Sequence, residues 1–393
     1  MDSTAAVLPI PILSGASAPE RQHAANGSAR LRDSFGRDIT DLRLSVTDRC
    51  NYRCVYCRSG EEGIVFTELP IAEYVRMVRL FVSLGVEKVR LTGGEPLLRA
   101  GLVPMITELS TLRTAFTPDG EPVSSSRPGD PLDLALTTNG HLLEAMATDL
   151  KAAGLRRVTV SMDAVEPDIF ARITRVPRSF ERVLAGVRAA QAAGLGPVKV
   201  NCVLLRGFND SQIEGFAEFS RREGVIVRFI EFMPLEEPSS SADETSEESS
   251  KSFSRRWTPE AVVRMEEIVA RLNRWSPGPG VPAGLVELPP NVASETAKRF
   301  TFADGRGEIG IIAPVSRPFC GHCSRIRLTS DGSIRTCLFS QSDHDLVGRM
   351  RRGGTDSELR AYIRHVVDRK EARHHIGEPD FRKPSRNMVH IGG

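Results

Sequence analysis

The strongest constraint on this fold is an alternation of strand-like and helix-like segments, repeated six times before residue 275. Strands are predicted at Leu42–Val46, Lys88–Thr92, Leu132–Thr138, Arg157–Ser161, Val198–Leu204 and Val227–Phe232. Helices are predicted at Glu68–Leu84, Leu102–Leu112, Leu142–Ala153, Asp168–Ala193, Asp210–Glu223 and Pro259–Asn273. Such an alternation requires a parallel sheet covered by helices. We therefore expect an α/β fold, an incomplete (βα)6 TIM-like barrel. A flat doubly wound sheet is the alternative, because periodicity alone does not separate the two.

Local composition suggests how the chain is divided. Residues 1–35 are rich in Ala, Ser, Pro and Gly, and we expect a disordered N-terminal extension. The partial barrel is assigned to residues 36–275, with a surface loop at Thr117–Pro131 and a mobile acidic insertion at residues 236–256. Residues 276–393 follow a Pro-Gly-Pro-Gly boundary and are predicted to form a smaller α+β domain with two β segments and two helices.

Whole-chain composition excludes several classes of protein. The hydrophobic fraction of 40% and the charged fraction of 26% are ordinary for a soluble globular protein, and the net charge of +2 does not suggest a nucleic-acid binder. No apolar run is long enough to span a membrane, and the N-terminus lacks the basic region of a secretory signal. We therefore expect a cytoplasmic protein, in which clustered cysteines bind metal rather than form disulfides.

The first cysteine set occupies the loop that follows the first predicted strand. It consists of Cys50, Cys54 and Cys57, with Tyr56 before the last cysteine. Three thiolates are one short of the four that close a structural zinc or a simple iron–sulfur site, so a metal bound here keeps an open position. We favour a [4Fe–4S] cluster with one open iron over a zinc site completed by a distant ligand or a disulfide pair.

The second cysteine set lies beyond the barrel, where Cys320, Cys323 and Cys337 are spaced Cys-x2-Cys-x13-Cys. A zinc ribbon completed by His322 or by another ligand is an open alternative. His322 lies between the paired cysteines and would have difficulty turning towards the same metal. Cys202 is predicted in the middle of a strand, where a buried apolar thiol is the simpler interpretation.

Several cations fall where an anion could bind them. Arg325 and Arg327 follow the second cysteine pair, and alternation along an extended segment places them on one face. Three further cations lie on predicted barrel strands: Arg43, Arg90 and Lys199. A charge inside a parallel sheet needs a partner, which is either a polyanionic ligand or an acidic neighbour such as Asp163. We favour the ligand.

A glycine-rich turn follows the second strand, in Thr92-Gly93-Gly94-Glu95-Pro96. The glycines allow the backbone to approach a ligand closely, and Glu95 could accept a hydrogen bond from an ammonium group. A plain strand-to-helix turn is the alternative.

Together these motifs resemble one known family. The first cysteine set and the Gly-Gly-Glu-Pro turn are similar to the signature of radical S-adenosylmethionine (SAM) enzymes. The wider chain, from about Asp38 to Gly393, resembles the GTP 3′,8-cyclase family, also called molybdenum cofactor biosynthesis protein A. The similarity rests on Asp41–Asn51, Leu136–Gly140, Arg228–Met233, the second cysteine set and the terminal Ile391-Gly392-Gly393.

This resemblance implies roles for particular residues. Cys50, Cys54 and Cys57 would hold a [4Fe–4S] cluster that binds SAM, and with Arg325 and Arg327 they would be the catalytic residues. Four residues would contact SAM: Tyr56, Gly94, Ser161 and Met233. Cys320, Cys323 and Cys337 would hold a second [4Fe–4S] cluster, whose open iron binds the guanine of GTP. The GTP contacts would be Arg43, Arg90, Thr137, Lys199, Arg325, Ile326 and Arg327. The Gly-Gly tail would reach into the active site.

The resemblance also implies a reaction and partners. A 5′-deoxyadenosyl radical would take hydrogen from C3′ of GTP, and the carbon radical would attack C8. Uptake of one electron and one proton would then give (8S)-3′,8-cyclo-7,8-dihydroguanosine 5′-triphosphate. The next pathway enzyme would be cyclic pyranopterin monophosphate synthase, and an electron donor such as flavodoxin or ferredoxin would supply the reductant. No nucleic acid or membrane partner is expected, and the protein would be a monomer or a homodimer. The alternatives are a radical SAM enzyme of the peptide maturase type and a non-catalytic zinc or redox-sensing protein.

Overall fold

The computed structural model describes residues 30–57, 68–114, 129–235, 257–384, 386 and 388–392. The acidic insertion at residues 236–256, most of the loop Thr117–Pro131 and the final Gly393 lie outside the described residues. So do residues 1–29 of the predicted N-terminal extension.

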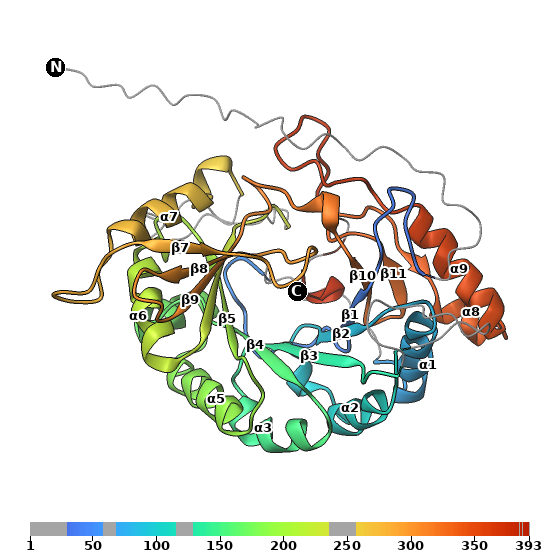
Figure 1. The fold of residues 1–393 in the computed structure, drawn as a ribbon. Helices are drawn as coiled ribbons and strands as arrows, with labels where there is room; N and C mark the ends of the chain where they lie inside the picture. The colour runs from blue at the N-terminus through green and yellow to red at the C-terminus, as the bar shows by residue number, and fades with distance from the viewer. Residues whose placement is uncertain are drawn as a thin grey trace, which may run out of the picture.

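Six parallel strands, hydrogen-bonded in sequence order, form the wall of the barrel. They are β1 (Asp41–Ser45), β2 (Lys88–Thr92), β3 (Asp133–Thr138), β4 (Arg157–Ser161), β5 (Lys199–Leu204) and β6 (Ile226–Glu231). The main covering helices are α1 (Ile71–Val82), α2 (Leu102–Ser110), α3 (Leu143–Ala152), α5 (Phe180–Ala192), α6 (Ile213–Glu223) and α7 (Met265–Arg274). Figure 1 shows the strands curving around a centre with these helices outside, which confirms the incomplete barrel and excludes the flat sheet.

One predicted helix is wrong, because the segment Asp168–Ala193 forms two helices. These are α4 (Pro167–Thr174) and α5, and between them Arg175 and Arg178 adopt the left-handed conformation, with φ of 57° and 55°. Pro177 lies between these two arginines. Proline disfavours helical geometry in the residue before it, so the helix ends and starts again after the turn.

The C-terminal region adds six strands, not two, and extends the sheet at both edges. At the β6 edge lie β9 (Glu308–Ile312), parallel to β6, then β8 (Lys298–Phe302) and β7 (Leu285–Leu288). At the β1 edge lie β10 (Arg325–Leu328), parallel to β1, then β11 (Ser333–Arg335) and β12 (His344–Asp345). The helices of this region are α8 (Val347–Arg351), α9 (Asp356–Asp368) and α10 (Met388–Ile391), where two were predicted. Strands of two to five residues pair only with distant segments, so local sequence carries little sign of them.

Residues 30–35, predicted to be part of a disordered extension, are ordered. The amide of Leu31 donates to the carbonyl of Leu84, and the side chains of Leu31 and Asp33 are fully buried. An antiparallel bridge joins Arg32 to Asp38. The segment before β1 is therefore part of the packed structure.

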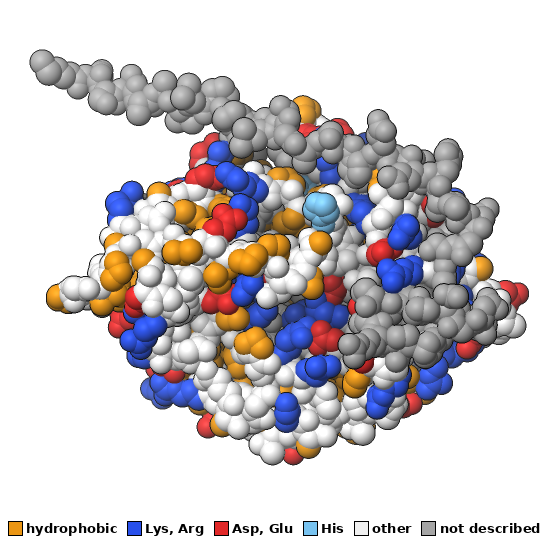
Figure 2. Space-filling view, viewed as in Figure 1, with side chains coloured by type: hydrophobic (Ala, Val, Ile, Leu, Met, Phe, Trp, Pro, Cys, Tyr) orange, Lys and Arg blue, Asp and Glu red, His pale blue; other side chains and the backbone are white. Residues whose placement is uncertain are grey.

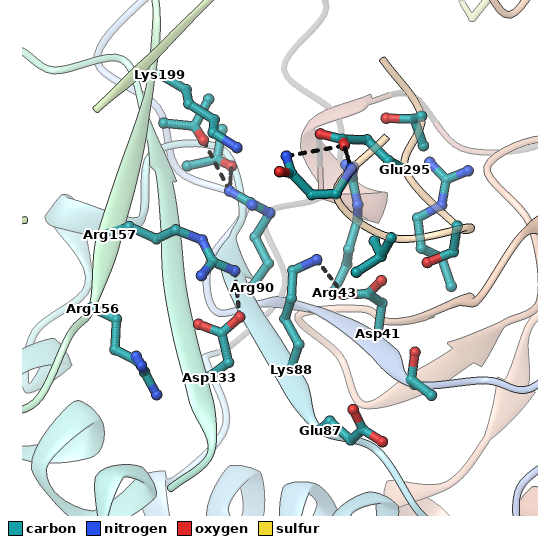
Figure 3. Close-up of a pocket in the computed structure, with 18 of the residues that line it drawn as sticks. Asp41, Arg43, Glu87, Lys88, Arg90, Asp133, Arg156, Arg157, Lys199 and Glu295 are labelled. Carbon is teal, nitrogen blue, oxygen red and sulfur yellow. Dashed lines mark hydrogen bonds and ion pairs between the residues drawn. The ribbon is translucent and has the colours of Figure 1, made fainter. Parts of the chain in front are cut away.

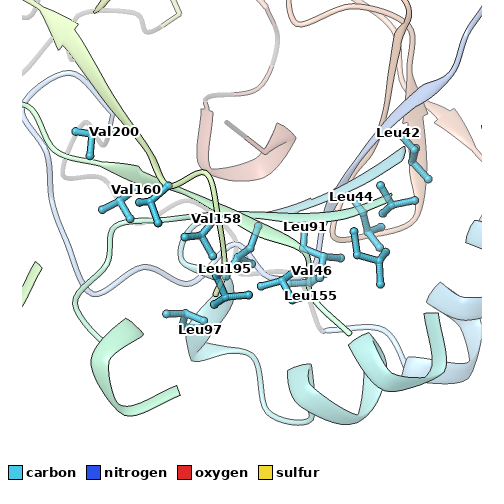
Figure 4. Close-up of a cluster of buried hydrophobic side chains, with 14 of the residues drawn as sticks. Leu42, Leu44, Val46, Leu91, Leu97, Leu155, Val158, Val160, Leu195 and Val200 are labelled. Carbon is cyan, nitrogen blue, oxygen red and sulfur yellow. The ribbon is translucent and has the colours of Figure 1, made fainter. Parts of the chain in front are cut away.

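The core lies between the strands and the helices, outside the barrel wall. Alternate residues of β1 and β4, such as Leu42, Leu44, Val158 and Val160, are buried on the helix-facing side (Figure 4). The remaining positions point inward and are largely polar or charged. A complete (βα)8 barrel usually fills its interior with branched apolar side chains. Here the interior is a polar cavity, so the fold reserves it for something other than packing. Within the described residues, no helix is both long and apolar enough to cross a membrane.

Candidate active site

The first cysteine set lies at the carboxyl end of β1, where barrel folds place their chemistry. Cys50, Cys54 and Cys57 share one loop and are partly buried. All seven cysteines are described, and none forms a disulfide. Burial, together with the charges of Asp163, Cys57 and Cys50, raises the pKa of Cys54 well above its ordinary value. Such a thiolate needs a bound cation to be stable, so these residues fit a metal cluster.

The glycine-rich turn after β2 supports this loop directly. The amide of Gly94 donates to the carbonyl of Thr47 at 2.8 Å, and the amide of Glu95 donates to Arg49 at 2.7 Å. A Cβ atom on Gly94 would lie 2.3 Å from the carbonyl oxygen of Arg49. The turn therefore packs against the backbone that immediately precedes Cys50, a contact that only glycine permits.

Glu95, predicted to accept a hydrogen bond from an ammonium group, also links two strand ends. Its side chain is fully buried and already accepts hydrogen bonds from the amides of Leu97 and Asn139 and from Oγ1 of Thr138. Burial raises its pKa to about 7, and these three bonds oppose that shift. Glu95 therefore joins the carboxyl ends of β2 and β3.

The other residues predicted to contact SAM also lie at carboxyl strand ends. The hydroxyl of Tyr56 donates to Asp163 Oδ2 at 2.7 Å, and the amide of Val203 donates to Asp163 Oδ1 at 2.8 Å. Ser161 is the last residue of β4 and is partly buried. Met233 follows β6 and is partly buried. The fold thus brings Tyr56, Gly94, Ser161 and Met233 to one end of the barrel, as predicted.

The second cysteine set lies beside β10 and β11, at the β1 edge of the barrel. Cys320 belongs to the short helix η5 (Cys320–His322), Cys323 ends it, and Cys337 follows β11. Burial acts to raise the pKa of Cys323, but Arg325 and Lys370 outweigh it and lower the pKa to about 6. His322 is exposed, and Cys202 is fully buried in β5 with its Sγ near the carbonyl of Asp163. The prediction that Cys202 is a buried structural thiol is confirmed.

The spacing of the thiols bears on the choice of metal. Among the described residues, the one group of three metal-binding side chains whose ligand atoms all lie within 4.8 Å of one another is His375, Glu378 and Asp380. Neither cysteine set is that compact. Two thiolates on one tetrahedral zinc ion lie about 3.8 Å apart, from the zinc–sulfur bond length. In this structure neither set therefore has its three sulfur atoms placed for a single zinc ion.

A cavity of about 860 Å³ occupies the barrel interior and reaches the amino ends of the strands. Figure 2 shows a hollow at the centre of the molecule in which Lys, Arg, Asp and Glu side chains gather. The predicted GTP contacts that line it are Arg43, Arg90, Thr137, Lys199 and Arg325. Figure 3 labels three of them, Arg43, Arg90 and Lys199. Further lining residues, which the sequence did not single out as contacts, include Lys88, Arg157, Asn201, Arg228 and Glu295. Lys88 and Asn201 lie two residues from Arg90 and Lys199 on their strands, and Arg157 lies two residues from the inward Thr159. Strand alternation could therefore have identified all three.

Six of the cavity cations lie on the barrel strands β1 to β6, and they fall into two groups. Three have carboxylate partners: Lys88 contacts Asp41 at 2.5 Å, Arg157 contacts Asp133, and Arg228 contacts Glu295 at 3.2 Å. Three others, Arg43, Arg90 and Lys199, form no ion pair with any described carboxylate. Arg90 donates only to the hydroxyls of Thr137 and Thr159, at 3.2 and 3.1 Å.

The electrostatics of the unpaired group favour an anion. Burial and the repulsion of nearby arginines lower the pKa of Arg43 well below its ordinary value and that of Arg90 to about 10. Burial and Arg228 lower the pKa of Lys199 to about 8. Asp163, the acidic partner considered from the sequence, contacts Tyr56 and Val203 instead. A polyanion would satisfy these charges.

The C-terminal tail enters the barrel beside Arg327. Arg327 is buried and donates to the carbonyls of Ile391 and Gly392. Figure 1 shows the C-terminus inside the ring of strands. Gly392 has φ of 73°, and a Cβ there would lie 2.3 Å from Oγ1 of Thr92, so the position requires glycine.

Strand alternation places Arg325 and Ile326, both predicted to contact GTP, on opposite faces of β10. Arg325 lines the cavity, whereas the side chain of Ile326 is fully buried in the core on the opposite face. The Ile326 side chain therefore cannot line the cavity.

Sequence comparisons agree with this site. The radical SAM superfamily model matches residues 44–220, and the Molybdenum Cofactor Synthesis C model matches residues 225–376. The barrel, with three cysteines at the end of its first strand, defines a radical SAM enzyme. GTP 3′,8-cyclase of Acidothermus cellulolyticus is 41% identical over 347 residues, covering 86% of this chain and 85% of that protein. GTP 3′,8-cyclase of Moorella thermoacetica is 38% identical over 370 residues, covering 92% of this chain and 100% of that protein. The chain belongs to the GTP 3′,8-cyclase family.

Solved structures support the fold. The crystal structure of Streptococcus suis SuiB bound to S-adenosylmethionine matches with a TM-score of 0.54 and 11% identity, covering 88% of this chain and 76% of that chain. At this identity the match shows a shared architecture and carries no information on the substrate.

Proposed function

We propose that this chain cyclises GTP to (8S)-3′,8-cyclo-7,8-dihydroguanosine 5′-triphosphate, the first step of molybdenum cofactor biosynthesis. The observation that carries this proposal is the group Arg43, Arg90 and Lys199, which lacks carboxylate partners among the described residues. These cations line the same barrel whose strand ends carry the first cysteine set. A nucleoside triphosphate supplies the compensating charge at the required place.

Both cysteine sets would hold [4Fe–4S] clusters in this function. Cys50, Cys54 and Cys57 would hold the one that binds SAM, and Cys320, Cys323 and Cys337 would hold one facing the nucleobase. When bound and reduced, the first cluster and SAM supply a 5′-deoxyadenosyl radical. The chain's own residues do the rest: the cavity cations hold the phosphates, Arg325 approaches from the second cysteine set, and the barrel wall excludes water and orients the ribose.

We propose that this chain has the partners and the cellular location that are typical of the family. An electron donor such as flavodoxin or ferredoxin would reduce the first cluster, and cyclic pyranopterin monophosphate synthase would use the product. A cytoplasmic location is supported by seven cysteines without a disulfide. The net charge of +2 favours neither nucleic acid nor an anionic membrane as a partner.

Anaerobic turnover tests the function. The protein is reconstituted with iron and sulfide, reduced, and given SAM with or without GTP, and 5′-deoxyadenosine and nucleotide products are followed by mass spectrometry. We expect 5′-deoxyadenosine to depend on GTP and a product isomeric with GTP to form. Cys54→Ala should abolish both, while Cys202→Ala, a cysteine outside both sets, should retain both.

Other outcomes would redirect or reject the proposal. SAM cleavage that ignores GTP would indicate another radical SAM substrate. Absence of SAM cleavage by protein with both clusters loaded would reject the enzymatic function. Zinc at both cysteine sets, without sulfide, would support the non-catalytic alternative.

A further inference from the structure

A loop from the C-terminal region closes one side of the cationic cavity. It joins β7 to β8 and places Asn291, Val292, Ser294, Glu295 and Thr296 on the cavity wall. Figure 3 shows Glu295 beside the cavity, across from Arg90 and Lys199. This loop lies outside the strands β1 to β6, so the carboxylate of Glu295 does not belong to their alternation of inward polar and outward apolar side chains.

The carboxylate of Glu295 is held firmly in place. Its Oε2 accepts hydrogen bonds from the backbone amide of Asn291 at 2.8 Å and from the side-chain amide of Asn291 at 3.2 Å. The amide of Glu295 donates to the carbonyl of Val292, which closes the turn. Only 8% of the Glu295 side chain is exposed. The loop therefore presents Oε1 in a fixed direction.

Oε1 of Glu295 faces Arg228, which projects inward from β6. The two groups form an ion pair at 3.2 Å through one terminal nitrogen of the guanidinium. Gly310, opposite Arg228 in the sheet, has no Cβ, and a Cβ there would lie 3.1 Å from Cγ of Arg228. The stem of Arg228 thus lies across β9. Its buried Nε has no hydrogen-bond partner among the described residues. Since a guanidinium has five donors and Glu295 accepts from one terminal nitrogen, Arg228 keeps unused donors at the cavity wall.

The charge of Glu295 also acts on Lys199. Burial and Arg228 lower the pKa of Lys199, while Glu295 raises it. A single carboxylate therefore partly neutralises both cations at this side of the cavity. At the opposite side, the guanidinium of Arg325 on β10 stacks on Phe319 and forms no ion pair with a described carboxylate, although Asp41 on β1 lies in register with it.

From this geometry we propose that Glu295 is a specificity-determining residue, a carboxylate guard that the terminal phosphate of the nucleotide displaces from Arg228. The proposal rests on the proposed function. A nucleotide whose base lies near Arg325 and the second cysteine set extends its phosphates across the cavity, towards Arg228 and Lys199. Its base and inner phosphates supply the binding energy that offsets the loss of the Glu295–Arg228 pair. A free phosphate anion has no such additional contacts, so Glu295 keeps it from occupying the cations.

The test compares Glu295→Gln with Glu287→Gln. Glutamine keeps the shape and the acceptor at position 295 and removes the charge. Glu287 lies on β7, its side chain is 60% exposed, and its ion pair among the described residues is with Lys298, so it is a matched charge control outside the cavity. Glu295→Ala, which also removes the acceptor, is a second variant. Equilibrium dissociation constants for GTP, GMP and inorganic triphosphate are measured by titration calorimetry on anaerobically reconstituted protein without SAM.

We expect Glu295→Gln and Glu295→Ala to bind inorganic triphosphate roughly tenfold more tightly than wild type, as for removal of a close like charge. GTP binding should tighten by a smaller factor, and GMP binding should be unchanged because it does not reach Arg228. Inorganic triphosphate should then become a stronger competitor of GTP in both variants but not in Glu287→Gln. If wild type binds GTP and neither Glu295 variant binds triphosphate more tightly, the guard is rejected while the proposed function stands. If wild type binds no GTP, the proposed function itself is rejected and the guard with it.

Discussion

A buried ion pair fixes the segment before β1 against the second cysteine set, and its removal should be costly. Asp33 accepts hydrogen bonds from the amides of Phe35 and Arg37 with Oδ1, and Oδ2 contacts Nε of Arg37 at 2.6 Å. The guanidinium of Arg37 then donates to three carbonyls: Cys320 at 2.8 Å, Ala372 at 2.7 Å and Glu371 at 2.6 Å. The side chains of Arg37 and Asp33 are 4% and 0% exposed.

The magnitude follows from burial. Asp33→Ala leaves a guanidinium that is shielded from water without its counter-charge, and breaking a buried pair in this way costs about 3–5 kcal/mol. A neighbouring pair provides the control, because Arg32 contacts Asp38 at 2.7 Å with side chains that are 42% and 32% exposed. An exposed pair contributes at most about 1 kcal/mol, so Arg32→Ala should change stability by no more than that.

Urea unfolding of the metal-free protein measures both changes. A double-mutant cycle with Asp33→Ala and Arg37→Ala should give a coupling energy above about 2 kcal/mol, because each single variant leaves the other charge unpaired. The reasoning would be refuted if Asp33→Ala lost less than about 1 kcal/mol, or if Arg32→Ala lost as much as Asp33→Ala.

Three further predictions concern the cysteine sets and the cavity. Gly94→Ala forces a Cβ to within 2.3 Å of the Arg49 carbonyl and should lower bound iron by about half, measured by iron and sulfide analysis. Gly321→Ala, whose Cβ would meet nothing within 4 Å, is the control and should retain all of the iron. Lys199 has a pKa of about 8, so it is protonated at pH 7 and loses its charge as the pH rises through 8. GTP affinity, measured by titration calorimetry, should therefore fall between pH 7 and 9, and Lys199→Arg should remove most of that fall. Cys202→Ala should retain both clusters while losing about 1–2 kcal/mol of stability in urea unfolding, because Cys202 is a buried core thiol.

Local sequence predicted the six barrel strands well because each one combines two signals. The helix-facing residues are apolar, the inward residues are polar, and glycines such as Gly85 and Gly154 adopt positive φ where a helix ends before the next strand. Their places on predicted barrel strands singled out Arg43, Arg90 and Lys199 as charges that need a partner. The same criterion applies to Lys88, on β2 with Arg90, and to Arg157 on β4, and both line the cavity.

Other parts of the site depend on contacts that no local pattern contains. β9 and β10 pair with β6 and β1 across long sequence separations, and their short length gives weak strand signals. Glu295 reaches the cavity from a loop, so neither strand alternation nor helix periodicity applies to it. Glu95 shows a further limit: its motif suggested only a ligand contact, and no local pattern revealed that its buried carboxylate accepts hydrogen bonds from Leu97, Thr138 and Asn139.

The inward face of this barrel is arranged for binding rather than for stability. Filling the interior with apolar side chains would bury more hydrophobic surface, as complete barrels do. Instead Arg43, Arg90 and Lys199 face one another, and burial together with neighbouring arginines lowers the pKa of each. This arrangement destabilises the protein without its ligand, and the lost stability becomes favourable binding energy when a polyanion enters. The apolar core between strands and helices must hold the wall rigid against this repulsion, which explains why packing and charge are assigned to opposite faces of the same strands.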